Sequence, residues 1–166
     1  YRSGENHDGT LGHNWDYADN RRLVEVNAQN LAAIQQALAV NSILPGGSVP
    51  KVGDVVRMDG RSRADLYVRN TDGSYRTPVG FYTRLVRNQD STFTEFFADG
   101  MQVRYNQPDT SGLARMTEVR DRNDNRMSYQ YDAFGQLDQV IDTLGRTIDY
   151  LFDGQGRLAQ VRDFMG

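Results

Sequence analysis

Apolar and polar residues alternate along the C-terminal third of the chain. The apolar positions of this alternation are Met127, Tyr129, Tyr131, Ile148, Tyr150 and Phe152. A period of two is typical of a β-strand that buries one face, because successive side chains point to opposite sides of the sheet. The pattern therefore predicts strands at both places.

An Asp-x-x-Gly element separates the predicted strands and recurs every ten or eleven residues. Three copies lie within the pattern: Asp132 with Gly135, Asp142 with Gly145, and Asp153 with Gly156. A further copy spans residues 163–166. The aspartate can accept a hydrogen bond from a backbone N–H two residues on, and glycine can adopt a left-handed conformation. Each element is thus expected to reverse the chain.

The repeating unit is a two-stranded hairpin, because a shift of 21 positions superimposes one half of the pattern on the other. Tyr129 falls on Tyr150 and Leu137 on Leu158. Val140 follows Leu137 by three positions, a spacing that would place the two side chains on opposite faces of a regular strand. We therefore expect either a β-bulge or burial on both faces.

Upstream, weaker alternation predicts more strands. Asp-Gly pairs at 59–60, 72–73 and 99–100 are strong hairpin signals, and residues 121–125 are interpreted as a degenerate copy of the same turn. We expect strands near 52–58, 63–69, 81–87, 92–97 and 101–105. The repeating hairpins are expected to reach back past residue 113.

Residues 27–44 break the β pattern. Leu31, Ile34 and Leu38 recur at helical spacing among alanine and glutamine, and Pro45-Gly46-Gly47 ends the segment. We predict one α-helix near residues 28–41, lying against the sheet or covering its open end. A structural role is favoured over a partner-binding one, because an amphipathic stretch usually faces its own core.

The fold class predicted from these patterns is mainly β, an antiparallel meander of successive β-hairpins. We expect an N-terminal β region at 1–112 with a helical insertion at 27–50, followed by repeat hairpins at 113–166. Together they form one continuous domain, because 166 residues suffice for one core. Since the pattern is still running at Gly166, we expect the chain to be cut from a longer protein.

Composition excludes several classes of function. The formal net charge is −3, which argues against a nucleic-acid surface, and the absence of cysteine excludes disulfides, thiolate metal sites and cysteine nucleophiles. We expect no membrane insertion, because no apolar run approaches the length of a membrane-spanning helix.

Catalytic and metal sites are not expected either. His7 and His13 lack a closed set of metal ligands, and the calcium-loop spacing that starts at Asp121 has Arg126 where glycine is needed. The recurring aspartates are too many and too regular to be an acid and base pair. We therefore predict no enzyme activity, no cofactor and no metal, and assign structural roles to the turn residues.

Three stretches resemble the RHS/YD-repeat family. Residues 145–158, with Gly145-Arg146, Asp153 and Gly156-Arg157, are similar to the repeat G-R-x-x-x-Y-x-Y-D-x-x-G-R-L. The preceding copy, residues 125–137, keeps Tyr-x-Tyr-Asp but has glutamine for the arginine. Residues 9–15, Gly-Thr-Leu-Gly-His-Asn-Trp, are similar to the G-P-L-G-x-G-W stretch that opens the RHS region. The insertion at 27–50 has no counterpart.

The resemblance implies a structural fragment of a β-shell that encapsulates or presents a C-terminal toxin or effector. Its implied partners are the remainder of the shell and that effector, and its implied location is exported, extracellular or at the cell surface. The family's self-cleaving aspartate motif has no match here, so no catalytic residue is carried over.

Two alternatives remain open at this point. A surface adhesin module would bind glycans through exposed aromatic rings, with Tyr129, Tyr131 and Tyr150 as the possible contacts. A hydrolase would need a concave site with converging carboxylates. Unpaired strand edges would also have to be covered by the helix or lead to edge-to-edge self-association.

Overall fold

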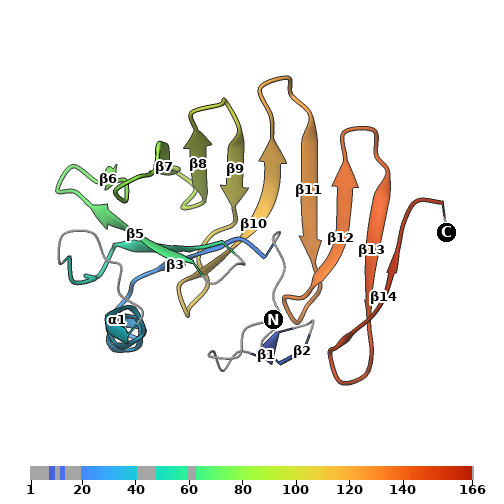
Figure 1. Ribbon diagram of the computed structural model, residues 1–166, viewed down its shortest axis with the longest axis horizontal. Helices are drawn as coiled ribbons and strands as arrows, with labels where there is room; N and C mark the ends of the chain where they lie inside the picture. Colours follow the sequence, from blue (N-terminus) through green and yellow to red (C-terminus); the bar gives the residue numbers. More distant parts are fainter. Residues whose placement is uncertain (1–7, 10–11, 14–19, 41–47, 60–62, 166) are drawn as a thin grey trace.

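The computed structural model describes residues 8–9, 12–13, 20–40, 48–59 and 63–165. Its main element is a twelve-stranded antiparallel sheet, and one α-helix lies beside it in the described chain (Figure 1). The mainly β, hairpin-built fold predicted from the sequence is therefore confirmed. The opening motif at 9–15 falls largely outside the described residues, as do His7, Gly60 and Gly166.

The elements follow one another along the chain in a fixed order. A separate two-stranded sheet comprises β1 (Asp8–Gly9) and β2 (Gly12–His13). The main sheet and its helix comprise β3 (Arg22–Glu25), α1 (Leu31–Val40), β4 (Val55–Met58), β5 (Ala64–Arg69), β6 (Tyr75–Arg76), β7 (Thr83–Arg87), β8 (Phe93–Phe97), β9 (Gln102–Tyr105), β10 (Leu113–Arg120), β11 (Arg126–Tyr131), β12 (Leu137–Asp142), β13 (Thr147–Phe152) and β14 (Leu158–Arg162). The pattern did not indicate β3 or β6.

The sheet branches at β10, which is a departure from a simple meander. One edge of β10 pairs with β3 along Leu113–Arg115 and with β11 along Glu118–Arg120, while the opposite edge pairs with β9. Three groups of strands therefore meet at β10. We call β3 to β6 the first arm, β7 to β9 the second arm, and β11 to β14 the C-terminal ladder.

The two arms face one another and enclose the main core. Tyr67 on β5 donates a hydrogen bond to Glu95 on β8, and the rings of Tyr75 and Phe93 meet edge to face with centroids 6.2 Å apart. The core continues from the arms onto the first strands of the ladder. Its buried members are Leu23, Val55, Tyr67, Tyr75, Leu85, Phe93, Val103, Tyr105, Ala114, Met116, Tyr129, Leu137 and Val140.

The helix lies against the outer face of the first arm. Leu38 packs with Val26, Val56 and Leu66, which alternate with the inward residues of the same strands. The helix begins at a reciprocal cap, since Asn27 Oδ1 accepts the backbone N–H of Asn30, and the Asn30 side chain accepts that of Asn27. The expectation that it lies against the sheet is correct: the helix packs on a face of the first arm and not over the open end of the sheet (Figure 1).

The same β-bulge occurs three times in the C-terminal half. Register shifts fall between Met116 and Glu118, between Leu137 and Gln139 opposite Tyr131, and between Leu158 and Gln160 opposite Phe152. In the second copy the extra residue brings Leu137 and Val140 to the same buried face. Of the two alternatives left by the three-residue spacing, the bulge is the correct one.

Burial decreases along the C-terminal ladder although the residue types repeat. Val140 on β12 is 4% exposed, whereas Val161, at the equivalent position 21 residues later on β14, is 51% exposed. The difference arises because β12 lies between two strands, while β14 pairs only with β13 in the described chain. Side chains of the ladder are therefore most covered next to β10 and least covered on β14.

This gradient predicts unequal costs for one substitution made at two matched sites. We expect Val140→Ala to lower the free energy of unfolding by about 2 kcal/mol, through lost apolar burial and a residual cavity. We expect Val161→Ala to cost about 0.5 kcal/mol or less, because half of that side chain is already solvated. Chemical denaturation of both variants measures the difference, and equal losses would contradict the observed gradient.

Candidate functional site

The six turn residues singled out in the sequence lie at the rims of the ladder, in one recurring geometry. In each turn the aspartate Oδ1 accepts the backbone N–H groups of the residues two and four positions on, at 2.8–2.9 Å. The residues involved are Asp132 with Phe134 and Gln136, Asp142 with Leu144 and Arg146, and Asp153 with Gln155 and Arg157. Each aspartate thus holds a three-residue loop closed.

The glycine of each turn adopts the left-handed conformation. Gly135 and Gly145 both have φ of +78°, and Gly156 has φ of +75°. The glycine N–H donates to the carbonyl of the turn's first residue, as between Gly135 and Asp132 at 3.0 Å. A side chain bearing a Cβ is strained at such a φ. The glycine is therefore required by backbone geometry.

The same turn recurs upstream with different residues. Asp109 and Asp121 occupy the first position, and in the second of these turns Asp124 takes the left-handed position with φ of +72°. At three further turns the aspartate stands third instead of first and accepts the N–H two residues on. These are Asp72, Asp90 and Asp99. The eight turns therefore use their aspartates as backbone acceptors.

Hydrogen bonds hold several of these carboxyl groups in the charged form. The pKa of Asp142 lies below its ordinary value chiefly because the Arg146 side chain donates to it, and that of Asp153 chiefly because the Arg157 backbone N–H does so. The side chain of Asn125 lowers the pKa of Asp121 in the same way. These shifts follow from turn closure and not from a solvent-excluded active site.

These shifts predict a loss of stability in acid. A carboxyl whose pKa is lower in the folded chain binds fewer protons there than in the unfolded chain, so its contribution is complete above the unfolded-state pKa. It is lost as the pH falls through the folded-state pKa. We expect the free energy of unfolding to drop below about pH 4, and Asp142→Asn to flatten that dependence. Urea unfolding at a series of pH values measures both.

The matched control is Asp138→Asn, which removes the same charge from an exposed position on β12 outside the turns. We expect this variant to keep the acid dependence of the parent chain. If Asp142→Asn and Asp138→Asn change the slope equally, the turn carboxyl is not the titrating group responsible.

The three tyrosines considered as glycan contacts are at least partly covered. Tyr129 is 5% exposed, while Tyr131 and Tyr150 are half-buried against the main core. The Tyr131 hydroxyl donates to the Met116 carbonyl at 2.8 Å, at the bulge of β10. Tyr131 therefore ties β11 to the bulge of the neighbouring strand β10.

A side-chain hydrogen bond to the turn of the next hairpin also repeats with the period of 21 residues. Arg115 Nε donates to the Gly135 carbonyl at 3.1 Å, and Gln136 Nε2 donates to the Gly156 carbonyl at 2.8 Å. Arg115 and Gln136 are equivalent in the repeat, as are the two glycines. We call these the rim bonds. The sequence interpretation missed them, although the 21-residue spacing of their residues was a signal.

A buried cluster of charged and polar side chains lies between the two arms. No sequence motif indicated it. Glu95 on β8 is 0% exposed, and its two oxygens accept hydrogen bonds from the hydroxyls of Tyr67 at 2.8 Å and Tyr105 at 2.9 Å. Arg57 Nε on β4 lies 3.2 Å from Glu95 Oε1 as an ion pair. Thr83 also hydrogen-bonds Tyr67.

Burial and nearby charges shift the pKa of three members of this cluster. Burial, followed by the negative charge of Glu95, raises the pKa of both Tyr67 and Tyr105, so that their hydroxyl groups remain donors. Burial alone would lower the pKa of Arg57, but Glu95 and, to a smaller extent, Tyr105, Tyr67 and Asp65 together offset this, and the pKa lies above its ordinary value. The cluster joins β4, β5, β8 and β9 through fixed polar contacts.

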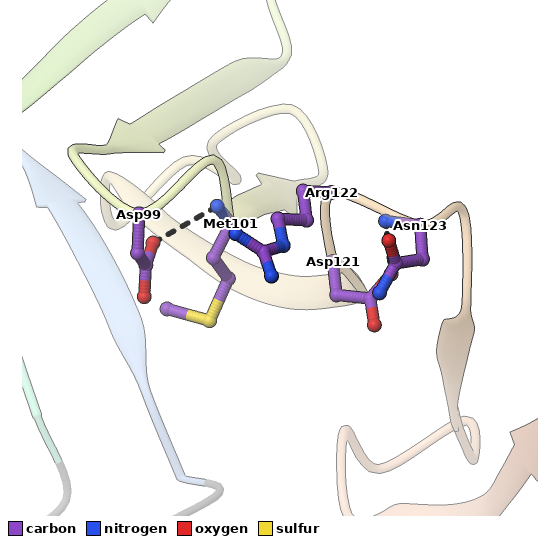
Figure 2. A pocket seen from close by; sticks show the side chains of 5 residues that line it. All are labelled: Asp99, Met101, Asp121, Arg122 and Asn123. Atoms are coloured by element: carbon purple, nitrogen blue, oxygen red, sulfur yellow. Dashed lines mark hydrogen bonds between the residues drawn. The ribbon is translucent and has the colours of Figure 1, made fainter.

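A shallow hollow in the described chain lies elsewhere, where two rim turns meet. Its volume is about 290 Å³, and its lining consists of Asp99, Met101, Asp121, Arg122 and Asn123. Figure 2 shows that Asp99 and Asp121 are engaged in their own turns, through the N–H groups of Met101 and Asn123. The residues that line this hollow do not include a nucleophile beside a base.

Within the described ranges, no three His, Cys, Asp or Glu side chains gather closely enough to hold a metal ion. No helix of the described chain is long and apolar enough to cross a membrane. His7, one of the two histidines considered as ligands, lies outside those ranges.

Comparisons with known proteins give no family or relative: no protein-family model matches this chain, and no curated protein is significantly similar to it. The function must therefore be argued from the geometry of the turns, the rim bonds and the buried cluster.

Proposed function

We propose that this chain is a wall segment of a hairpin-repeat β-shell of the RHS/YD-repeat kind, without catalytic activity of its own. The shell would enclose or present a C-terminal toxin or effector, and this segment would supply part of its wall. Its partners would be the rest of the shell and the effector. This role requires that the protein be exported or lie at the cell surface.

The observation that carries the proposal is the recurrence of one structural unit at 21-residue spacing. Turn, bulge and rim bond all repeat, with Met116, Leu137 and Leu158 at equivalent positions beside the bulges. Each hairpin, with its turn, bulge and rim bond, sets its own strand length and its contact with the next hairpin. Such a hairpin can therefore be repeated many times in one sheet. That is the property a wall needs.

The chemistry of the charged residues agrees with a structural role. The turn aspartates accept hydrogen bonds from backbone N–H groups. The carboxylate of Glu95 accepts hydrogen bonds from two tyrosines and forms an ion pair with an arginine in the core. A catalytic carboxylate needs access to substrate and a pKa suited to proton transfer. The described residues bring together no such pair in an open cavity.

Electron cryo-microscopy of the natural protein that contains this chain tests the proposal. An antibody raised against residues 63–165 would capture that protein from its source cells. We expect a hollow particle in which residues 113–162 appear as adjacent hairpins of a continuous wall, with additional density for the effector inside or at an opening. A solid particle, or this chain as an isolated appended module, would contradict the proposal.

A further inference from the structure

We propose that the outer edge of β14 binds one further β-hairpin of the same turn type, and that Arg157 selects this hairpin by donating a hydrogen bond to the glycine carbonyl of its turn. This inference rests on the proposed function and names the partner of the wall's open edge. The partner is defined by chemistry: a strand pair whose loop presents a left-handed glycine at the rim.

The rim bonds provide the first argument. Arg115 donates to the Gly135 carbonyl and Gln136 donates to the Gly156 carbonyl, so each unit contacts the turn of the next unit. Adding 21 to each donor position gives Gln136 and then Arg157. Arg157 is therefore the third donor in a series whose first two members already bind a glycine carbonyl.

The side chain of Arg157 is suitably placed for this role. It is 67% exposed at the rim where β14 begins. Its Nε donates to Asp153 Oδ2 at 2.9 Å, and its Nη2 group donates to Gln155 Oε1 at 2.6 Å. A guanidinium carries about five N–H donors in a rigid fork, so these contacts orient the group and leave donor capacity for a carbonyl.

The apolar face of β14 provides the second argument. Leu137 and Val140 are buried between β11 and β13, whereas their equivalents Leu158 and Val161 are only partly covered. A strand added beyond β14 would supply the missing neighbour on that side. Its side chains would cover Leu158 and Val161 as Ile148 and Tyr150 of β13 help to cover the face of β12.

The edge itself carries no device that excludes a new strand. Natural sheets protect an edge with proline, inward charges or a covering helix. β14 contains no proline, its only charged residue is Arg162, which pairs with Asp149 on β13, and α1 lies on the first arm. Its bulge at Ala159 is the same bulge that β10 and β12 carry, and both of those strands have partners on two sides.

The test is an extended chain in which a second copy of residues 146–166 follows Gly166, so that the 21-residue period continues. Hydrogen exchange followed by mass spectrometry measures protection of the β14 amides. We expect the extension to slow their exchange about tenfold or more, because they become hydrogen-bonded to a new strand. An extension of the same composition in scrambled order is the control, and it should leave exchange unchanged.

Two substitutions at Arg157 isolate its role. Arg157→Gln provides the donor found at position 136, so it should retain the protection given by the extension. Arg157→Ala should reduce that protection about tenfold. Both variants lose the Asp153 ion pair, and the same pair of substitutions in the chain without the extension measures that background effect.

The outcomes separate the two proposals. If the extension is ordered but the β14 amides remain unprotected, the wall proposal and this inference are both overturned. A protected extension that does not respond to Arg157→Ala would overturn only the role of Arg157. If light scattering shows that the chain without the extension forms dimers and that the extension abolishes them, a second copy is the occupant and the inferred partner is wrong.

Discussion

Glu95→Ala is expected to lower the free energy of unfolding by about 3–5 kcal/mol, because the buried Arg57 guanidinium loses the nearer of its two carboxylate partners and keeps only Asp65, at 3.5 Å. It also removes the acceptor of two tyrosine hydroxyls, Tyr67 and Tyr105, which lie in the core and cannot reach solvent without moving. Chemical denaturation monitored by circular dichroism measures the loss. The two arms should separate first, because the cluster joins them.

The matched control is Glu118→Ala on β10. Glu118 also pairs with an arginine, Arg104, at 3.7 Å, but the Arg104 side chain is 54% exposed. An exposed ion pair contributes at most about 1 kcal/mol. We therefore expect a small effect at Glu118. Similar losses for the two variants would mean that the charge pair between the arms contributes no more than a surface pair.

Gly112→Ala is expected to be about as damaging, with a loss of about 3–5 kcal/mol, because two separate penalties combine. Gly112 has φ of +87°, which strains any residue with a Cβ, and a Cβ built there would lie 2.2 Å from the Glu25 carbonyl oxygen. That carbonyl is backbone and cannot rotate away. The turn before β10 would therefore have to move from β3, and thermal unfolding measures the cost.

Gly145→Ala separates the two penalties. Gly145 has φ of +78°, but no atom lies within 4 Å of a Cβ placed there. The substitution introduces backbone strain without a clash, and we expect a loss of about 1–2 kcal/mol. Equal losses at both glycines would show that the contact between Gly112 and β3 does not constrain the junction.

The junction at Gly112 links the helix cap to the branch of the sheet. Asn30 Nδ2 donates to the carbonyls of Glu25 and Ser111, at 2.9 and 2.8 Å, and Glu25 N–H donates to the Gly112 carbonyl at 2.7 Å. The start of α1, the end of β3 and the turn before β10 thus share one hydrogen-bond network. Damage at Gly112 should consequently loosen the helix as well as the sheet.

The sequence was most informative where structure is local. The Asp-x-x-Gly spacing placed the reversals of the ladder, because a turn is decided within about five residues by side-chain capping and by the conformational freedom of glycine. The three-residue interval from Leu137 to Val140 indicated either a bulge or burial on both faces, and the structure has the bulge. The helix prediction at 28–41 overlaps Leu31–Val40, because its apolar spacing and its stop at Pro45 are local signals.

The sequence interpretation was less complete where contacts are distant along the chain. β3 has only four residues and pairs with β10 some 90 positions later, and nothing within its own segment indicates that partner. In the turns at Asp72 and Asp99 the aspartate is the third residue and not the first. The sequence interpretation therefore did not recognise that these turns have the same geometry as those of the ladder. A pattern read one strand at a time cannot show that a sheet branches.

By itself, the sequence determined that this protein reverses direction at regular intervals and builds antiparallel hairpins, because turn chemistry and the alternation of side chains are properties of adjacent residues. Only the tertiary structure decided that Glu95 is buried among Arg57, Tyr67 and Tyr105, and that Val140 is covered while Val161 is exposed. Burial depends on which strands become neighbours in space, and identical residues acquire different energies from different neighbours.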